Sequence, residues 1–267
     1  MKERIDILLV KKGFFESREK AKRALMAGLV IVNGRLIDKP DMRFPTEVKI
    51  EIKKSLPYVS KGGFKLKKAL EIFKLNVKDF VVLDIGASTG GFTDCLLKEG
   101  AKKVYALDVG KGILHESLRN DPRVVVMEGV NARYIKSEDF QEKFDLITID
   151  VSFISLLKIF PRLPNLLKEC GKIIALIKPQ FEAGPDKVKR GGIVRDLEVH
   201  VEIVKKIVNE VKSLNFFLEN LTYFFSKKGK GNIEYPSLFG KENKEIDFEK
   251  IIKEAWNLWN LRLYSKE

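Results

Sequence analysis

A glycine-rich loop between an apolar segment and a helical one carries the first residue types that could bind a small ligand. It runs from Asp84 to Phe92 as DIGASTGGF, and its glycines let the backbone turn tightly and approach a ligand. Asp108 ends the next apolar segment, where a carboxylate can accept hydrogen bonds from both hydroxyls of a ribose. A dinucleotide-binding dehydrogenase is expected to carry G-x-G-x-x-G, whereas this loop has Gly86, Ser88 and Gly91 in those positions. NAD is therefore disfavoured as the ligand.

The D-x-G-x-S-T-G-G-F loop resembles the cofactor loop of class I methyltransferases. The resemblance implies S-adenosylmethionine as the cofactor, with Asp84 near its methionine end. Glu128 and Asn131 follow a third apolar segment, where we expect the adenine base. A plain strand-to-helix turn would also use glycine, but the strand, loop, helix and distal acid together favour a cofactor site. Its expected residues are Asp84, Gly86, Ser88, Gly90, Gly91, Phe92, Asp108, Glu128 and Asn131.

Two charged residues at the ends of later apolar segments suggest proton-transfer chemistry. Asp150 follows LITI, and Lys178 follows IIALI just before Pro179. Because a buried ammonium group without a partner is costly, we expect either that Asp150 pairs with Lys178 or that the lysine is neutral. Both states suit a group that accepts a proton.

The elements that must position these side chains alternate between strands and helices. From Val81 onward, strand-like apolar segments are separated by segments of helical length, and the segments 221–227 and 231–240 supply late strands. Strands that are apolar almost throughout indicate a sheet covered on both faces. The expected fold class is therefore α/β, a Rossmann-like, mostly parallel sheet of the class I methyltransferase type with helices on both faces.

The first 60 residues form a different, more basic unit. They hold 14 Lys or Arg against 8 Asp or Glu, in a chain with a formal net charge of +13. Two amphipathic helical segments precede a hairpin around Asn33-Gly34, an order that resembles the small α+β alpha-L RNA-binding module of a small-subunit ribosomal protein and of pseudouridine synthases. The resemblance implies RNA contacts, although a solvated helix face is the alternative for each cation. The candidates are Arg4, Arg18, Lys20, Lys22, Arg23 and Arg35.

Longer motifs resemble the TlyA family, also called haemolysin A. They are YVSKGGFKL, DIGASTGGFTDCLL, LRNDPRV, DVSFISL, LIKPQFEAG, GGIVRD and GNIEY. The resemblance implies an FtsJ-like ribose 2′-O-methyltransferase acting on cytidine in ribosomal RNA or ribosomal subunits. It also implies a catalytic Lys-Asp-Lys-Glu tetrad, which falls on Lys65, Asp150, Lys178 and Glu234. We expect an RNA-binding domain over residues 1–54, a linker over 55–62 and the methyltransferase domain over 63–267.

Within the tetrad, the hypothesis makes Lys178 the base that accepts the proton of the ribose hydroxyl and Asp150 the group that orients it. Lys65 and Glu234 would position the hydroxyl and balance the charge. The four groups can share a proton, so the choice of one base describes only one protonation state.

Two other functions stay open. The family name suggests a membrane-lytic protein, but the sequence has neither a signal-peptide core nor an apolar stretch long enough to span a membrane, so we expect a cytoplasmic protein without stable membrane association. The other alternative is a non-catalytic RNA-binding assembly factor. The two histidines and two cysteines are scattered, so no metal site is expected, and the oligomeric state is left open.

Overall fold

The computed structural model describes residues 2–26, 29–52, 57–189, 191–225 and 231–264. The chain divides into two compact units, Met1–Pro57 and Tyr58–Glu267. The expected linker over 55–62 lies partly outside the described residues. Its second half, from Tyr58, belongs to the larger unit.

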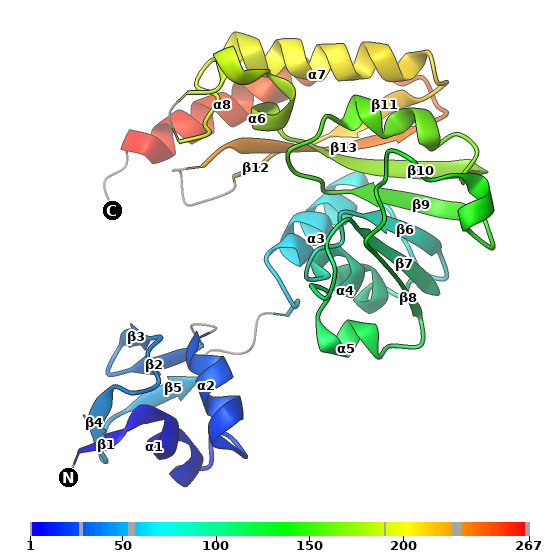
Figure 1. Cartoon of the computed structure of the whole chain (residues 1–267). Helices are drawn as coiled ribbons and strands as arrows, with labels where there is room; N and C mark the ends of the chain where they lie inside the picture. Colours follow the sequence, from blue (N-terminus) through cyan, green and yellow to red (C-terminus); the bar gives the residue numbers. More distant parts are fainter. Residues whose placement is uncertain (1, 27–28, 53–56, 190, 226–230, 265–267) are drawn as a thin grey trace. The chain divides into compact units, whose positions relative to one another are not determined.

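The smaller unit combines two helices with short antiparallel strands (Figure 1). In the three-stranded sheet β2 pairs with both β3 and β5, and the β2–β3 turn at Asn33 and Gly34 has positive φ at both positions, as the sequence predicts. A second sheet, β1 with β4, was not predicted, because three-residue strands leave little periodicity to detect. The elements are β1 (Lys2–Arg4), α1 (Ile5–Lys11), α2 (Arg18–Met26), β2 (Val30–Val32), β3 (Arg35–Ile37), β4 (Arg43–Pro45) and β5 (Ile50–Ile52).

The larger unit is built on a mostly parallel sheet in the order β11-β13-β10-β9-β6-β7-β8. Its strands are β6 (Val81–Ile85), β7 (Lys103–Asp108), β8 (Val124–Glu128), β9 (Phe144–Ile149), β10 (Leu167–Ile177), β11 (Phe217–Leu221), β12 (Phe224–Phe225) and β13 (Ile233–Gly240). Its α-helices are α3 (Gly62–Phe73), α4 (Gly91–Lys98), α5 (Glu116–Arg119), α6 (Pro179–Glu182), α7 (Leu197–Lys212) and α8 (Phe248–Tyr264). Short 3₁₀ turns lie at Ser137–Asp139, Leu156–Lys158, Phe160–Arg162 and Pro185–Lys187.

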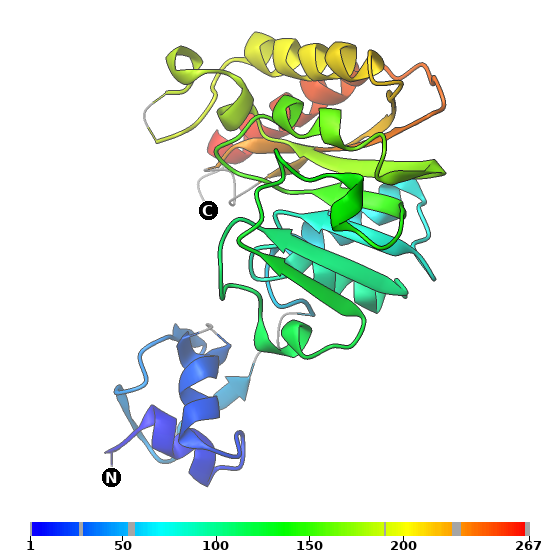
Figure 2. The ribbon, with the colours of Figure 1, turned by 45° about the vertical axis from the view of Figure 1, so that its right-hand side comes forward.

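Helices cover both faces of this sheet, giving three layers (Figures 1 and 2). Successive residues of a strand point to opposite faces of the sheet and pack against different helices. Leu83 packs in one apolar core with α7 and α8, and Val82 packs in the other with α3 and α4. The expected α/β class with helices on both faces is therefore confirmed. Within the described part of the chain, no helix is both long enough and apolar enough to cross a membrane.

The sheet topology brings the chemistry-bearing ends of the strands together. β6, β7, β8, β9 and β10 run parallel, so their carboxyl ends lie along one edge. β13 runs antiparallel to β10, with Ile177 paired to Tyr235. One step further along this register, Glu234 faces Lys178. A strand from late in the chain thus delivers a carboxylate beside the lysine that follows β10.

Candidate active site

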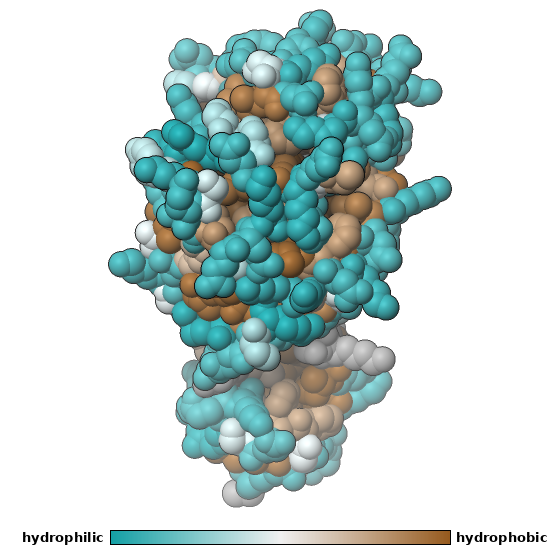
Figure 3. Space-filling model, turned by 90° about the vertical axis from the view of Figure 1, so that its right-hand side faces the viewer, coloured by the Kyte–Doolittle hydropathy of each residue, from teal (hydrophilic) through white to brown (hydrophobic). Residues whose placement is uncertain are grey.

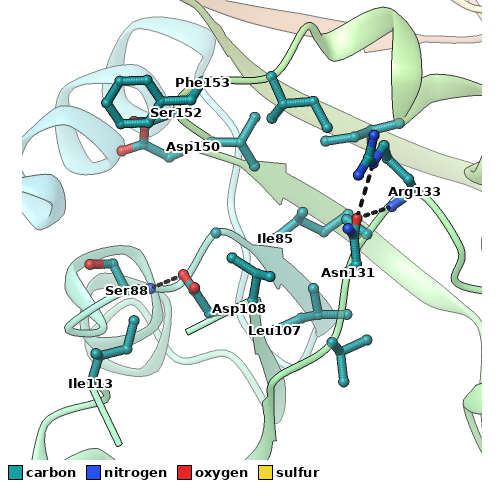
Figure 4. A pocket seen from close by; sticks show the side chains of 17 residues that line it. Ile85, Ser88, Leu107, Asp108, Ile113, Asn131, Arg133, Asp150, Ser152 and Phe153 are labelled. Carbon is teal, nitrogen blue, oxygen red and sulfur yellow. Dashed lines mark hydrogen bonds between the residues drawn. The ribbon is translucent and has the colours of Figure 1, made fainter. Parts of the chain in front are cut away.

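A cavity of about 490 Å³ opens at the carboxyl ends of β6, β7, β8 and β9 (Figure 4). This volume lies within the roughly 300–1,000 Å³ range of small-molecule sites. Its walls combine apolar side chains with polar and charged ones in similar measure. The lining residues used below are Gly86, Ser88, Asp108, Ile113, Asn131, Arg133, Asp150, Ser152 and Phe153.

The loop after β6 has the conformation that its glycines were expected to permit. Gly86 has φ +83°, and a Cβ atom there would lie 2.6 Å from the backbone oxygen of Asp150. Ser88 also has positive φ, at 51°, and lines the cavity. Only glycine therefore lets β6 and the segment after β9 approach so closely beneath the cavity.

Gly90, Gly91 and Phe92 shape the site from behind its walls. A Cβ atom on Gly90 would meet Leu118 at 2.2 Å, and one on Gly91 would meet the Oγ of Ser60 at 2.2 Å. Phe92 lies on α4 and is buried in the apolar core that α4 shares with α3. These three residues are not among those lining the cavity. We therefore expect them to fix the shape of the loop rather than to contact a ligand.

Asp108 projects into the cavity from the end of β7. Its Oδ2 accepts a hydrogen bond from the backbone N–H of Ser88, and its Oδ1 accepts one from that of Gly110, both at 2.8 Å. These bonds fix the carboxylate in one orientation. Because each carboxylate oxygen can accept more than one hydrogen bond, the group can still receive two hydroxyls of a ribose.

Asp84 lies outside the cavity wall. The residue is fully buried, and its two carboxylate oxygens accept hydrogen bonds from the hydroxyls of Thr93 and Thr148 at 2.7 and 2.9 Å. Burial raises the pKa of the Asp84 carboxyl to about 6, against the opposing effect of these hydrogen bonds. The geometry therefore makes Asp84 a tie between β6, α4 and β9, and places it behind the site rather than on its surface.

Glu128 also lies outside the cavity lining, although it was expected near the adenine. Its carboxylate accepts hydrogen bonds from the backbone N–H groups of Gly112, Ile113 and Leu114, at 2.8 to 3.1 Å. Arg119 donates a further bond at 2.8 Å. The bond from Arg119 and those from the backbone lower the pKa of the Glu128 carboxyl to about 2. Glu128 thus fastens the loop that brings Ile113 to the cavity.

Asn131 does line the cavity, next to Arg133 (Figure 4). Its Oδ1 accepts hydrogen bonds from the backbone N–H and the Nε of Arg133, at 3.1 and 3.4 Å. The amide nitrogen of Asn131 is thereby directed away from Arg133, since the two ends of an amide point in different directions. An amide nitrogen in this place can donate a hydrogen bond to a ring nitrogen of a purine.

The four tetrad residues form two ion pairs. Lys178 Nζ lies 2.5 Å from Asp150 Oδ1, and Lys65 Nζ lies 2.6 Å from Glu234 Oε2. Lys178 also donates to Ser152 Oγ at 3.3 Å. The side chains of both pairs are largely buried. Of the two states left open for Lys178, the structure shows the one in which Asp150 pairs with it.

The two pairs come from distant parts of the sequence but meet through the sheet. Lys65 lies on α3, which packs on β13, and Glu234 lies in β13 opposite the position of Lys178. Asp150 follows β9 and lines the cavity. Asp150 is therefore the group that belongs both to the cavity and to an ion pair of the tetrad.

Three residues of this site were not identified from the sequence. Ser152 binds Lys178, Arg133 orients Asn131, and Phe153 lines the cavity with 91% of its surface exposed and φ at 63°. In Figure 4, Phe153 and Ser152 lie beside Asp150, away from Asn131 and Arg133. For Ser152 and Phe153, the available signal was their place two and three residues after Asp150. A left-handed phenylalanine cannot be inferred from sequence.

The candidate RNA-binding cations of the smaller unit differ in their surroundings. Arg4 and Arg18 both contact Asp6, whereas Lys20 and Lys22 pair with Glu16 and Glu19 on the helix surface. Arg35 is exposed at the hairpin, and the side chain of Arg23 lies outside the described residues. The unit thus presents two guanidinium groups at one place, Arg4 from the end of β1 and Arg18 from the start of α2.

A mostly parallel sheet, with the antiparallel strand β13 inserted near its edge and a cavity at the strand ends, defines the fold of an S-adenosylmethionine-dependent methyltransferase. Comparison with known families gives the particular family. Residues 58–241 match the FtsJ-like methyltransferase family, and residues 3–49 match the S4 domain. The chain belongs to the FtsJ-like methyltransferases and carries an N-terminal S4 domain. The resemblances inferred from the motifs are thus confirmed.

Several relatives match the chain over most of its length. A Bacillus subtilis protein that carries the name rRNA methyltransferase YqxC is 46% identical, over 94% of this chain and 92% of its own length. The Mycobacterium tuberculosis 16S/23S rRNA (cytidine-2′-O)-methyltransferase TlyA is 38% identical, over 87% of each chain. A Streptococcus thermophilus structure that carries the name hemolysin is 42% identical, with a TM-score of 0.74 over 98% of this chain and 97% of that one.

Proposed function

We propose that this protein transfers a methyl group from S-adenosylmethionine to the ribose 2′-hydroxyl of a cytidine in ribosomal RNA, in the cytoplasm. The observation that carries the proposal is the position of Asp150, which lines the cofactor cavity and pairs with Lys178 at 2.5 Å. A base beside a methyl-donor site is what alkylation of a hydroxyl requires. The TlyA relative supports cytidine and ribosomal RNA as the substrate, because its name states both.

The residues around the cavity fit S-adenosylmethionine. Asp108 would hold the ribose hydroxyls of the cofactor and Asn131 its adenine, while Ile113 and the other apolar side chains would cover the base. Gly86 provides backbone space beneath the ligand, since a side chain there would strike Asp150. When bound, the cofactor supplies an electrophilic methyl group on a sulfonium centre.

Lys178 would accept the proton from the attacking 2′-hydroxyl through its Nζ atom. The hydroxyl needs this help because it is a poor nucleophile near neutral pH. Asp150 and Ser152 hold the Nζ atom in place from the carboxyl end of β9. The neutral amine would take the proton from the hydroxyl and become the ammonium group whose ion pair with Asp150 the structure shows.

Lys65 and Glu234 would position the ribose. Their ion pair is enclosed, with side-chain exposures of 16% and 6%, and the Nζ of Lys65 lies 5.9 Å from the ring centre of Phe224. An enclosed pair of opposite charges offers both a donor and an acceptor to a hydroxyl. Glu234 on β13 is the neighbour of the Lys178 position that follows the adjacent strand β10. The ion pair of Lys65 and Glu234 would therefore lie beside the attacking oxygen.

The test compares Lys178→Ala with Lys205→Ala, an exposed lysine of α7, as the matched control. Ribosomal subunits from a strain lacking the protein are incubated with methyl-labelled S-adenosylmethionine, and the modified nucleoside is identified by mass spectrometry after digestion. We expect 2′-O-methylcytidine with the unaltered protein and with Lys205→Ala. Lys178→Ala should lose at least about 10²-fold in rate, the lower end of what a general base contributes, with cofactor affinity unchanged.

Methyl transfer to a base or to protein would overturn the proposed reaction. Full turnover by Lys178→Ala would instead remove Lys178 from its role while leaving the reaction itself in place. Cofactor affinity is measured separately by isothermal titration calorimetry.

A further inference from the structure

A fully buried carboxylate in the S4 domain binds two arginines. The residue is Asp6, in the first turn of α1, with no exposed surface. Its Oδ1 accepts a hydrogen bond from Arg4 Nε at 3.0 Å, and its Oδ2 accepts bonds from Nη2 of Arg18 at 2.8 Å and of Arg4 at 3.3 Å. The carboxylate thus joins the end of β1 to the start of α2.

The bonds to Asp6 leave part of each guanidinium group exposed and able to donate further hydrogen bonds. The side chains of Arg4 and Arg18 are 35% and 50% exposed. A guanidinium carries five N–H donors, and the bonds to Asp6 use two from Arg4 and one from Arg18. The remaining donors belong to two planar groups held at a fixed separation, which is the geometry that suits phosphate oxygens.

A third arginine lies beside this pair. Arg43 is the direct partner of Arg4 in the β1–β4 ladder, and it is exposed. Opposite residues of an antiparallel pair have Cβ atoms about 4.5–5.5 Å apart on the same face of the sheet. The segment before Arg43 is fixed to the start of α1 by a hydrogen bond of 2.8 Å from Ile5 N–H to Met42 O.

Placing two like charges directly opposite each other destabilises a short ladder. Asp6 and the nearby Asp41 offset part of this repulsion, and both raise the pKa of Arg4. Three arginines against these two acids still leave a net positive charge. A cluster that is unfavourable for the free protein is favourable once an anion covers it.

We propose that Asp6 is a positioning residue that holds Arg4 and Arg18 as a rigid pair, and that this pair and Arg43 together bind the phosphodiester backbone of folded RNA. The proposal deepens the proposed function, on which it rests, by naming the arginine cluster and the acid that organises it. The ligand is the RNA backbone rather than a base, because guanidinium groups that bind phosphate oxygens do so without sequence information.

The decisive variant is Asp6→Asn, because charge and geometry predict opposite results. The change adds one positive charge to the domain, so electrostatics alone would tighten RNA binding. If Asp6 positions the two arginines, binding should instead weaken, by about 3- to 10-fold. Asp38→Asn makes the same chemical change at an exposed acid of the same unit, and it should bind equally well or slightly more tightly.

Binding is measured by fluorescence anisotropy of the full chain with large-subunit ribosomal RNA, without S-adenosylmethionine, at several salt concentrations. Each lost phosphate contact should reduce the slope of log affinity against log salt by about 0.7–0.9. Arg43→Gln should show this reduction, because it removes a charge. Arg4→Lys keeps the charge but cannot reproduce the two bonds to Asp6, and it should weaken binding.

Arg43→Gln and Arg4→Lys keep the proposal testable if Asp6→Asn unfolds, which thermal unfolding of the variant would reveal. Tighter or unchanged binding by folded Asp6→Asn would overturn the positioning role, and an unchanged salt slope for Arg43→Gln would remove Arg43 from the cluster. Binding of the unaltered protein to phosphatidylglycerol vesicles in place of RNA would overturn RNA as the ligand. Because these assays contain no methyl donor, they do not depend on whether methyl transfer is observed.

Discussion

Among the described residues, each unit of this protein has one carboxylate without exposed surface, and the two carboxylates have opposite surroundings. Asp6 meets the guanidinium groups of Arg4 and Arg18, whereas Asp84 meets the hydroxyls of Thr93 and Thr148. Burial alone would raise the pKa of Asp6, but the hydrogen bonds and charges of the two arginines lower it below its ordinary value. Burial raises the pKa of Asp84 to about 6, because hydroxyl donors compensate only in part.

The difference shows how partner chemistry divides the two tasks. A carboxylate paired with arginines stays charged at neutral pH and can hold cations at a surface for an anionic ligand. A carboxylate that receives only uncharged donors, here two hydroxyls and a backbone N–H group, ties strands together beneath a loop and can take up a proton near pH 6. Neither role follows from burial alone.

The largest expected effect that tests this contrast is on stability at pH 7. Asp6→Asn removes the negative charge that the two arginines share and one of its two acceptor oxygens. It should lower the free energy of unfolding of the S4 domain by about 1–3 kcal/mol, less than for a fully buried pair because both arginines are partly exposed. Asp84→Asn removes an unfavourably buried charge and should cost less than Asp6→Asn. Urea denaturation of the full chain, followed for each unit, measures both. A greater loss in Asp84→Asn would break the comparison.

The second effect is on the pH dependence of stability. The folded pKa of Asp84, about 6, lies above its ordinary value, so its contribution is fully present below about pH 4 and is lost as the pH rises through 6. Between pH 5 and 7 this linkage should remove about 1 kcal/mol from the unaltered protein. Asp84→Asn should not show that loss. The pH dependence of the free energy of unfolding is measured for both proteins. If the two curves had the same shape, Asp84 would not titrate near pH 6 and the prediction would be wrong.

The smallest effect concerns a third carboxylate, Glu128, whose oxygens accept hydrogen bonds mainly from backbone N–H groups. Its pKa of about 2 means that it stays ionised down to low pH, and its contribution is lost only as the pH falls from about 4.5 through 2. At pH 7, Glu128→Gln should loosen the loop that carries Ile113 and weaken cofactor binding by about threefold, with kcat unchanged. Glu116→Gln, an exposed acid of α5, is the matched control, and calorimetry measures both. A fall in kcat alone would contradict this role.

The sequence predicted the larger unit more fully than it predicted the contacts inside it. The apolar segments ending at Asp84, Asp108, Asp150 and Lys178 marked the carboxyl edge of a parallel sheet, because strands buried on both faces show unbroken apolar runs. The same reasoning could not separate Asp108, which lines the cavity, from Asp84, which lies behind it. Successive side chains of a strand point to opposite faces, so a shift of one residue decides which way a side chain points. At the end of a strand, the sequence periodicity does not show where that alternation stops.

Contacts between distant segments were beyond prediction from pattern alone. The pairing of Lys65 with Glu234 depends on β13 entering the sheet beside β10, and the arginine cluster depends on a three-residue ladder between β1 and β4. Glu128 was predicted at the correct end of β8, yet its carboxylate turns toward the loop rather than the cavity. Local propensity carries no information about such choices.

The position of β13 also sets the order in which the enzyme can become active. This strand comes after β11 in the chain but lies between β10 and β11, so the sheet stays open until residues near 240 have been synthesised. Pairings between distant segments of this kind form late and slowly during folding. A nascent chain emerging from the ribosome would therefore display its RNA-binding domain well before its catalytic centre could close.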